Sequence, residues 1–279
     1  MDPDFDPEHF DAYYRFAPAA LALREVVRLA AVKGIDLPEP ILDVGCGDGL
    51  FARIAYPDKH IWGVDVDPTE VKRAQRTASY QTLICGNVCC IQLPPEFFGS
   101  AIANCSLEHV PDLAGALANI RGSLKPGALF VLIVPTPDWS QKTGLAEGLT
   151  RVGLRGVAKA YGRALDRVFK HAHLHDAGWW SDRLRDAGFE TVEIKPIVTR
   201  ATSWTFELLL PASAVGYVVK RITGRWVLAP SLRGATSDAT RALVERLLRR
   251  LPAGPVDTGG EYLIVARATG DVPDVRPHA

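Results

Sequence analysis

The sequence predicts an α/β fold built on a doubly wound, mostly parallel sheet. Short apolar stretches alternate with helical stretches on short connections, which is the pattern of a parallel sheet with crossover helices. The first apolar stretch runs directly into a turn with three glycines at alternate positions. The chain has 279 residues, 47% of them hydrophobic, which is enough for one large α/β core or for a core with a small cap.

Each element is assigned from its local pattern. Strands are expected at residues 41–44, 61–66, 82–85, 100–105, 128–134, 189–199 and 259–268. Helices are expected at residues 21–30, 50–55, 68–78, 113–124 and 177–188. Pro68 supports the start of its helix, because proline is well suited to the first helical turn.

Two sections interrupt this alternation, and we interpret them as insertions that form a helical cap. Residues 136–175 hold no predicted strand, and residues from about 200 to 255 are irregular and helix-rich. The predicted organisation is an N-terminal helical segment (1–40), a core (41–135), a first insertion (136–175), a further helix and strand of the core (176–199), a second insertion (200–255), and the last strand with the tail (256–279). We expect both insertions to pack over the carboxyl ends of the strands.

The overall charge and the cysteines disfavour some classes of protein. Lysine plus arginine and aspartate plus glutamate both number 32, so the chain lacks the basic excess that nucleic-acid-binding proteins usually show. The acidic, aromatic start of the sequence is not typical of a signal peptide, and no apolar stretch is long enough to span a bilayer. Five cysteines without a Cys-x-x-Cys pair favour a reduced, cytoplasmic protein.

The stretch "ILDVGCGDGLF", residues 41 to 51, indicates the ligand site, because ligands of such sheets bind beside the first strand-to-helix turn. Gly45, Gly47 and Gly49 occupy the first, third and fifth positions, whereas a dinucleotide fingerprint needs glycine at the sixth, which is Leu50 here. No Lys-Ser/Thr pair follows, so a P-loop is also excluded. Asp43 would repel a phosphate and suits a zwitterionic ligand that carries an amine.

Asp65 ends the second strand, 22 residues after Asp43, where a carboxylate can accept both hydroxyls of a ribose. The ordered motifs "ILDVGCGDGLF", "WGVDVDP", "GNVCCIQLP", "NCSLEHVPD" and "LKPGALFVLIVP" resemble those of the class I S-adenosylmethionine-dependent methyltransferases, in particular the small-molecule group called type 11. The resemblance covers residues 41–135 well and extends more loosely through "WWSDRLRDAGFE". It implies a seven-stranded Rossmann-like sheet and S-adenosylmethionine as the cofactor.

The resemblance also implies roles for individual residues. The cofactor-binding set is Asp43, Gly45, Cys46, Gly47, Asp65, Val66, Asn87, Val88 and Cys105. In this set the glycines admit the methionine part, Asp65 takes the ribose hydroxyls, Val66 lies against the adenine, and Cys105 lines the reactive end. Asn87 departs from the Asp that the family usually has, although an amide oxygen can still accept a bond from the adenine amino group. Gly99 stands where many relatives have an Asp.

Histidines are the candidates for a general base. His109 follows the fourth strand, and "HAHLH" places His171, His173 and His175 at alternate positions. We select His109 and His173 as candidate catalytic residues. The alternatives are helix-start packing for His109, and an exposed loop or a metal site for "HAHLH". The cysteine spacing fits no zinc pattern, so we expect no metal and a turnover that survives a chelator.

The insertions carry the only indications of the acceptor. Cations recur every four residues along a predicted amphipathic helix, at Arg151, Arg155, Lys159, Arg163 and Arg167. This stripe is interpreted as a solvated face, with an anionic substrate or peripheral contact with a membrane surface as alternatives. An apolar acceptor cavity is expected, with Trp139, Tyr161 or Trp204 in its walls and His109 at its floor.

The predicted function is methyl transfer from S-adenosylmethionine to a small-molecule acceptor by in-line attack on the sulfonium methyl. An oxygen or nitrogen acceptor is expected rather than carbon, and the acceptor is apolar or anionic. A non-catalytic S-adenosylmethionine-binding module or sensor is the alternative from a different class. A dinucleotide oxidoreductase is disfavoured by Leu50, and nucleic acid is disfavoured as a partner by the zero net charge. The acceptor molecule and the oligomeric state stay open.

Overall fold

The chain forms two compact units in the computed structural model, which describes residues 5–77, 80–169, 172–251 and 260–270. One unit contains the sheet and comprises residues 34–137, 170–195 and 262–279. The other is helical and comprises residues 1–33, 138–169 and 196–261. We call them the sheet unit and the helical unit.

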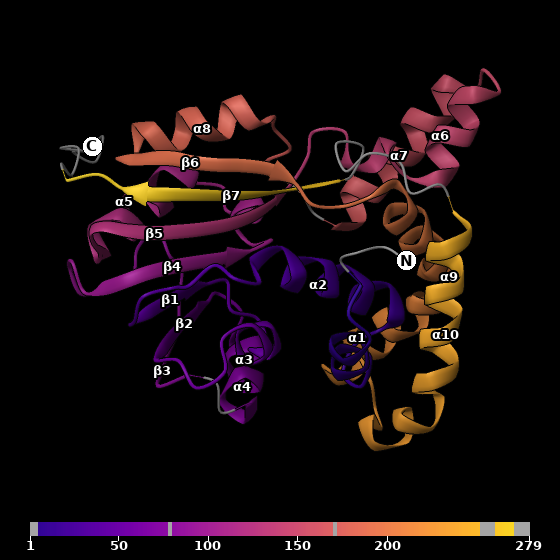
Figure 1. Ribbon diagram of the computed structural model, residues 1–279, viewed down its shortest axis with the longest axis horizontal. Coiled ribbons are helices and arrows are strands. Elements are labelled where there is room, and N and C mark those ends of the chain that lie inside the picture. Colours follow the sequence, from indigo (N-terminus) through magenta and orange to yellow (C-terminus); the bar gives the residue numbers. More distant parts are fainter. Residues whose placement is uncertain (1–4, 78–79, 170–171, 252–259, 271–279) are drawn as a thin grey trace. The chain divides into compact units, whose positions relative to one another are not determined.

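The sheet has seven strands in the order β3-β2-β1-β4-β5-β7-β6 (Figure 1). The strands are β1 (Ile41–Val44), β2 (Ile61–Asp65), β3 (Thr82–Cys85), β4 (Phe98–Asn104), β5 (Leu124–Pro135), β6 (Phe189–Pro196) and β7 (Glu261–Ala268). The strands β1 to β5 pair in parallel, and β7 is antiparallel. The predicted doubly wound, mostly parallel sheet is confirmed.

The strand order creates a switch point between β1 and β4. From β1 the chain continues to β2 and β3 on one side, and then β4 returns to pair with the other side of β1. Crevices at such switch points, outside the carboxyl ends of the strands, are where ligands bind in open α/β sheets. The glycine turn therefore starts at the position where the topology favours a ligand site.

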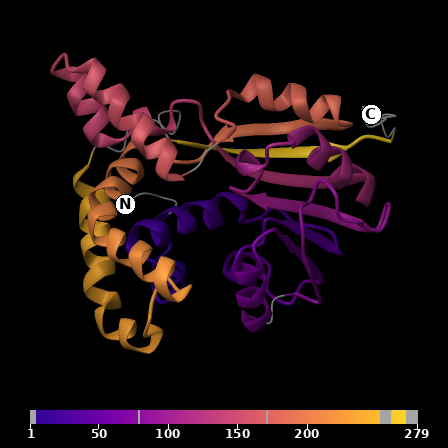
Figure 2. The ribbon, with the colours of Figure 1, turned by 180° about the vertical axis from the view of Figure 1, so that it is seen from behind.

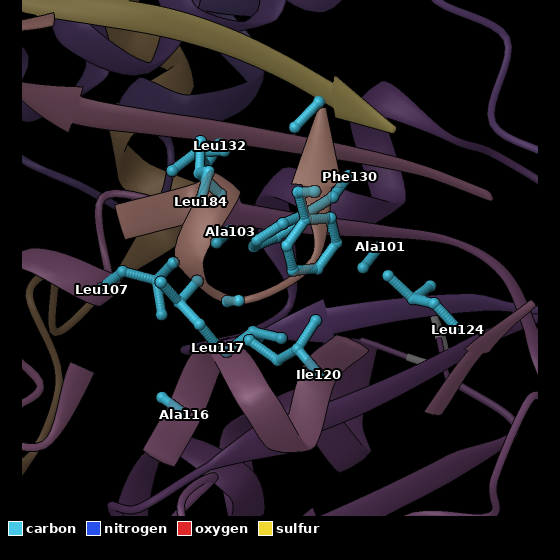
Figure 3. Close-up of a cluster of buried hydrophobic side chains, with 14 of the residues drawn as sticks. Ala101, Ala103, Leu107, Ala116, Leu117, Ile120, Leu124, Phe130, Leu132 and Leu184 are labelled. Atoms are coloured by element: carbon cyan, nitrogen blue, oxygen red, sulfur yellow. The ribbon is translucent and has the colours of Figure 1, made fainter. Parts of the chain in front are cut away.

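The helices of the sheet unit are α3 (Leu50–Ala55), α4 (Pro68–Thr77), α5 (Leu113–Ser123) and α8 (Ala177–Asp186), with a 3-10 turn η1 (Leu107–His109). The helices α5 and α8 cover one face of the sheet (Figure 2). Their apolar residues Leu117, Ile120 and Leu184 surround Ala103 and Phe130 of the central strands (Figure 3). This packing buries the alternate residues of β4 and β5 and fixes which strand residues face it.

The helical unit combines the N-terminal segment with both insertions. Its elements are α1 (Pro7–Tyr14), α2 (Ala19–Val32), η2 (Trp139–Gln141), α6 (Gly144–Arg151), α7 (Arg155–Phe169), α9 (Arg200–Thr223), η3 (Pro230–Arg233) and α10 (Gly234–Arg250). The N-terminal helices pack on the second insertion, α2 against α9 and α1 against α10, and α6 of the first insertion contacts α9. No local pattern in the sequence indicates that the N-terminal helices belong with the insertions. No described helix is long and apolar enough to cross a membrane.

A buried ion cluster joins distant segments of the helical unit. Glu261 Oε1 accepts from Arg24 Nη2 at 2.5 Å and from Arg28 Nη2 at 2.6 Å, and its Oε2 accepts from Arg28 Nε at 3.0 Å. The Arg24 guanidinium also lies 5.1 Å from the ring centre of Phe206 and 5.7 Å from that of Trp139. Burial raises the pKa of Glu261, but the charges of Arg24 and then Arg28 outweigh it and lower the pKa to about 2.

We expect the Glu261→Gln variant to lose about 3–5 kcal/mol of unfolding free energy at neutral pH, because it removes the carboxylate that pairs with the buried Arg24 and one of the carboxylates that pair with Arg28. The folded-state pKa lies below the unfolded value of 4.5, so this contribution is present above pH 4.5 and is lost as the pH falls toward 2. Urea unfolding at several pH values measures both effects. The Glu25→Gln variant is the control, because Glu25 pairs with the same Arg28 at 2.5 Å and is more exposed than Glu261. Equal losses of unfolding free energy in the two variants would contradict the larger stabilising contribution assigned to Glu261.

Candidate functional site

The glycine turn after β1 is held in a left-handed backbone that other residues rarely adopt. Gly45, Gly47 and Gly49 have φ of +74°, +54° and +79°. The N–H groups of Gly45 and Cys46 donate to the Val64 carbonyl of β2 at 2.8 and 3.0 Å. These bonds continue the pairing of β1 with β2 beyond the strand and set the path of the turn.

The turn lies directly against the residue that follows β4. A Cβ on Gly45 would stand 2.2 Å from the Cβ of Ser106, so no larger residue fits there. Ser106 Oγ donates to the Val44 carbonyl at 2.6 Å. At Gly47, in contrast, no atom lies within 4 Å of an added Cβ. The turn therefore packs tightly against the end of β4 at Gly45 and leaves open space at Gly47.

Asp65 anchors the turn from the neighbouring strand. Its Oδ2 accepts from the Gly47 N–H at 2.8 Å, and its Oδ1 accepts from the Asp67 N–H at 2.8 Å. Burial raises the pKa of this half-buried carboxyl, although both backbone bonds oppose the rise. Each carboxylate oxygen carries two lone pairs, so both retain a free acceptor position for a ligand hydroxyl.

Asp43 is a buried acid in the strand itself. Its Oδ2 accepts from the Tyr80 hydroxyl at 2.6 Å. Burial, and then the charge of Asp65, raise the pKa of Asp43 to about 7, against the lowering effect of the Tyr80 bond. A nearby cation would reverse this rise. Sequence reasoning missed Tyr80, which precedes β3, because no local pattern connects it to Asp43.

The residues after β2 and β3 lie next to one another, since the Gly86 N–H donates to the Asp65 carbonyl at 2.9 Å. Val66 is 71% exposed although it follows a buried strand, so an apolar surface is presented beside Asp65. Asn87 Oδ1 accepts from the Cys89 N–H at 3.0 Å, which makes this side chain part of a local turn. Val88 packs its side chain into the core, and its carbonyl accepts from Asn119 Nδ2 at 2.6 Å.

Cys105 and Cys46 both lie at this edge of the sheet. Cys105, at the end of β4, has a φ of +48°, a conformation that costs free energy for a residue other than glycine. Its N–H donates to the Ile133 carbonyl at 3.0 Å. Cys46 is buried within the glycine turn, and burial raises the pKa of its thiol. Strained backbone of this kind is characteristic of functional sites.

The two candidate histidines approach the same segment. His109 ends η1 and its Nε2 lies 3.7 Å from Oε1 of the buried Glu108. The N–H groups of Ala172 and His173 donate to the Glu108 carbonyl at 2.9 and 3.0 Å, and His173 Nε2 lies 2.8 Å from the Val110 carbonyl. Ala172 and His173 therefore pack back on the segment that follows β4.

The remaining histidines of "HAHLH" are placed as follows. His175 stacks on Trp179 with ring centres 3.7 Å apart, and burial followed by the neighbouring His173 lowers its pKa. His171 lies outside the described residues. No group of three or more metal-ligating side chains is found in the described part of the chain.

The residues expected to line the acceptor cavity belong to the helical unit. Trp139 is buried and packs against Phe169 and Phe206, with ring centres 5.0 and 6.3 Å away. The Tyr161 hydroxyl donates to Glu207 Oε1 at 2.5 Å. Their role toward an acceptor stays a prediction.

Comparisons with known proteins identify the class. A family model described as a methyltransferase domain matches residues 12–194. An uncharacterized methyltransferase of Mycobacterium tuberculosis is 34% identical over 102 residues, which are 35% of this chain and 52% of that protein. A sterol 24-C-methyltransferase of Aspergillus fumigatus is 30% identical over 130 residues, 42% of this chain and 34% of that protein. The matched region thus spans about half of the mycobacterial protein.

The fold is similar to that of solved methyltransferases. The structure of an S-adenosylmethionine-dependent methyltransferase from Mesorhizobium loti superposes with a TM-score of 0.52 at 19% identity, covering 88% of this chain and 99% of that one. The chain belongs to the S-adenosylmethionine-dependent methyltransferase family. The class and the cofactor expected from the sequence motifs are confirmed.

We expect cofactor affinity to fall as the pH decreases through 7. The empty site takes up a proton on Asp43 below its pKa of about 7, whereas a bound ammonium favours the carboxylate. Calorimetry with S-adenosylhomocysteine should give a dissociation constant about 10- to 30-fold higher near pH 5.5 than near pH 8.

The Asp43→Asn variant is the control for this pH effect. Asparagine can still accept from Tyr80, so the fold should be kept while the pH dependence disappears. The ligand-free variant should also be more stable than the parent near pH 8, since a raised folded-state pKa means that ionisation of Asp43 destabilises the protein as the pH rises toward and through 7. Equal affinity of the parent at both pH values would contradict the role of Asp43.

Proposed function

We propose that this protein transfers the methyl group of S-adenosylmethionine to a small-molecule acceptor by in-line attack on the sulfonium methyl. The observation that carries the proposal is the pair of acids at the switch point. Asp43 lies buried below the glycine turn with its pKa raised to about 7, and Asp65 holds the turn while keeping free acceptor positions. This combination suits a ligand with an ammonium group and vicinal hydroxyls, and it suits a phosphate poorly.

The methionine part of the cofactor is assigned to the glycine turn. Gly47 leaves space above the backbone, Gly45 keeps the turn close to Ser106, and Cys46 contributes its backbone between them. Asp43 stabilises the ammonium group through its charge, and the Tyr80 hydroxyl keeps this carboxyl in a fixed orientation.

The nucleoside part is assigned to the ends of β2 and β3. Asp65 accepts from the ribose hydroxyls, and the exposed side chain of Val66 covers one face of the adenine. Asn87 keeps one lone pair on Oδ1 for the adenine amino group besides the bond from Cys89, and Val88 offers its backbone. Cys105 lines the reactive end, where its strained backbone directs the chain away from the strand.

S-adenosylmethionine supplies an activated methyl group when it is bound, so the protein's own task is mainly to position the acceptor. Holding two reactants in line can contribute roughly 7–11 kcal/mol in favourable cases. An oxygen or nitrogen acceptor also loses a proton, and a histidine at the site can take it. The name of the sterol relative refers to a carbon acceptor, but the two histidines near the end of β4 support an oxygen or nitrogen acceptor here.

The histidines differ in their freedom to act as a base. His173 Nε2 lies at hydrogen-bond distance from the Val110 carbonyl, which can only accept, so this nitrogen carries the proton in the neutral ring. His109 lies at the exposed end of the 3-10 turn, and its Nε2 is 3.7 Å from Oε1 of Glu108. We therefore assign the general base to His109 and the support of its segment to His173.

Methyl transfer is tested by following a labelled methyl group from S-adenosylmethionine into extracted small molecules. The acceptors are grouped into phenols, alcohols, amines and carbon nucleophiles. A labelled product with an O- or N-methyl group supports the proposal. Tight cofactor binding without transfer to any acceptor class would contradict it and favour the non-catalytic binding module.

With the acceptor in hand, we expect His109→Gln to lower kcat by about 10²- to 10⁴-fold, the usual contribution of a general base. His173→Gln should lower kcat less, because it removes a support and not the base. His60→Gln is the control, since His60 precedes β2 at the opposite edge of the sheet and accepts from Trp62 Nε1 at 3.3 Å. A His109→Gln variant with the parent's kcat at all pH values would exclude this histidine as the base.

A further inference from the structure

The turn between α6 and α7 presents apolar side chains to solvent. Val152 is 71% exposed, Leu154 is 50% exposed and Val157 is 53% exposed. The turn itself is well defined by backbone bonds, because the Val152 N–H donates to Gly148, the Leu154 N–H donates to Leu149, and Gly153 takes a φ of +85°. We call residues 151–159 of this helical hairpin the tip (Figure 1). Its apolar side chains are held outward on an ordered turn.

Cations alternate with these apolar residues. The tip reads "RVGLRGVAK", with Arg151, Arg155 and Lys159, and no acidic residue occurs from position 148 to position 165. The basic stripe expected from the sequence therefore coincides with the exposed apolar side chains. A surface that mixes exposed aliphatic residues with lysine and arginine is typical of segments that lie in the interface of an anionic bilayer.

A surface cavity lies beside the tip. It has a volume of about 430 Å³ and is lined by Asp138, Gln141, Lys142, Glu147, Thr150, Arg151, Arg155 and Lys159. Lys142 pairs with Asp138 at 3.1 Å, and Glu147 lies 3.2 Å from Arg151 and 3.4 Å from Arg200. Among the described residues, Arg155 and Lys159 have no acidic partner within 4 Å. The two acids are thus engaged by other cations, and the cavity keeps an excess of positive charge.

We propose that the tip docks this protein on anionic lipid membranes. Val152 and Leu154 enter the boundary between headgroups and acyl chains, while the cavity with Arg155 and Lys159 receives a lipid phosphate. An anionic bilayer is proposed as the partner because its charge complements the cations of the tip and its acyl region accepts the exposed aliphatic side chains. This role is independent of the proposed methyl transfer.

Other occupants fit the tip less well. A second copy of the chain related by a twofold axis would bring two cationic tips together without acids to pair them. A single-stranded nucleic acid is bound with aromatic side chains on which bases stack, and the tip has none. An acidic protein would satisfy the cations but would gain little from two exposed aliphatic residues on a tight turn. An anionic bilayer satisfies both features.

Cosedimentation with vesicles tests the proposal. The full chain is mixed with phosphatidylcholine vesicles that contain about 30% phosphatidylserine, and with pure phosphatidylcholine vesicles as the uncharged reference. We expect binding to the anionic vesicles only. Raising the salt concentration from about 0.1 to 0.5 M should weaken it, because exposed charges are screened. Absence of binding to anionic vesicles at low salt would overturn the proposal.

Two pairs of variants with matched controls locate the contact. The double variant Arg155→Gln, Lys159→Gln should lower the partition coefficient by roughly 20- to 30-fold, since each cation near the surface contributes about fivefold. The control is the double variant Lys72→Gln, Arg76→Gln, at exposed positions of α4. It removes the same number of positive charges and should change the partition coefficient little. Val152→Ser, Leu154→Ser should also weaken binding, whereas Val192→Ser, at an exposed valine of β6, should not. Equal losses in a variant and its control would overturn the assignment to the tip.

Inorganic phosphate distinguishes a lipid from a free anion. If the cavity is a lipid-headgroup site, phosphate competes only weakly with vesicles, because it lacks the apolar contact of Val152 and Leu154. Calorimetric binding of phosphate in the cavity without vesicle binding would overturn the membrane proposal. The membrane proposal would also be overturned if sedimentation shows a dimer and the double variant Val152→Ser, Leu154→Ser dissociates it. The tip would then bind a second copy of the chain.

Discussion

The carboxylate of Asp65 is the constraint on which the site depends. It accepts from the N–H of Gly47 in the turn after β1 and from the N–H of Asp67 after β2, so one side chain ties the ends of two parallel strands together. Glycine adopts a positive φ without strain, and the bond to Asp65 holds Gly47 in this one conformation. The contact of Gly45 with Ser106 then fixes the same turn against the end of β4. The turn, the two strands and the switch point are thereby locked into one arrangement before any ligand is present.

This arrangement carries a cost that points to its ligand. Asp43 lies buried beside Asp65, and burial together with that neighbouring charge raises its pKa to about 7. Ionisation of a buried carboxyl with a raised pKa destabilises the ligand-free protein at neutral pH, and a bound cation offsets this unfavourable free energy. The proposed cofactor brings an ammonium group, and its ribose hydroxyls suit the acceptor positions that Asp65 retains. The same two acids that a phosphate would avoid are therefore the features that favour S-adenosylmethionine.

The sequence predicted what local patterns encode. Alternating apolar strands and the glycine spacing placed β1 to β5 and the acids at positions 43 and 65 correctly. Contacts between residues far apart in the chain had no local signal, so the bond from Tyr80 to Asp43 and the cluster of Arg24, Arg28 and Glu261 were not foreseen. Asn87 and Val88 were assigned by motif position alone, and their side chains prove to serve a turn and the core. Their contacts with the cofactor stay predictions.

Titration calorimetry of the parent and of the Asp65→Ala variant with S-adenosylhomocysteine and with NADH tests the central claim most directly. We expect the parent to bind S-adenosylhomocysteine and to give no heat with NADH. The Asp65→Ala variant should bind more weakly by about 1.5–3 kcal/mol, the scale of hydrogen bonds to a charged group. Binding of NADH without binding of S-adenosylhomocysteine would contradict the cofactor assignment. An Asp65→Ala variant with the parent's affinity would contradict the role given to this carboxylate.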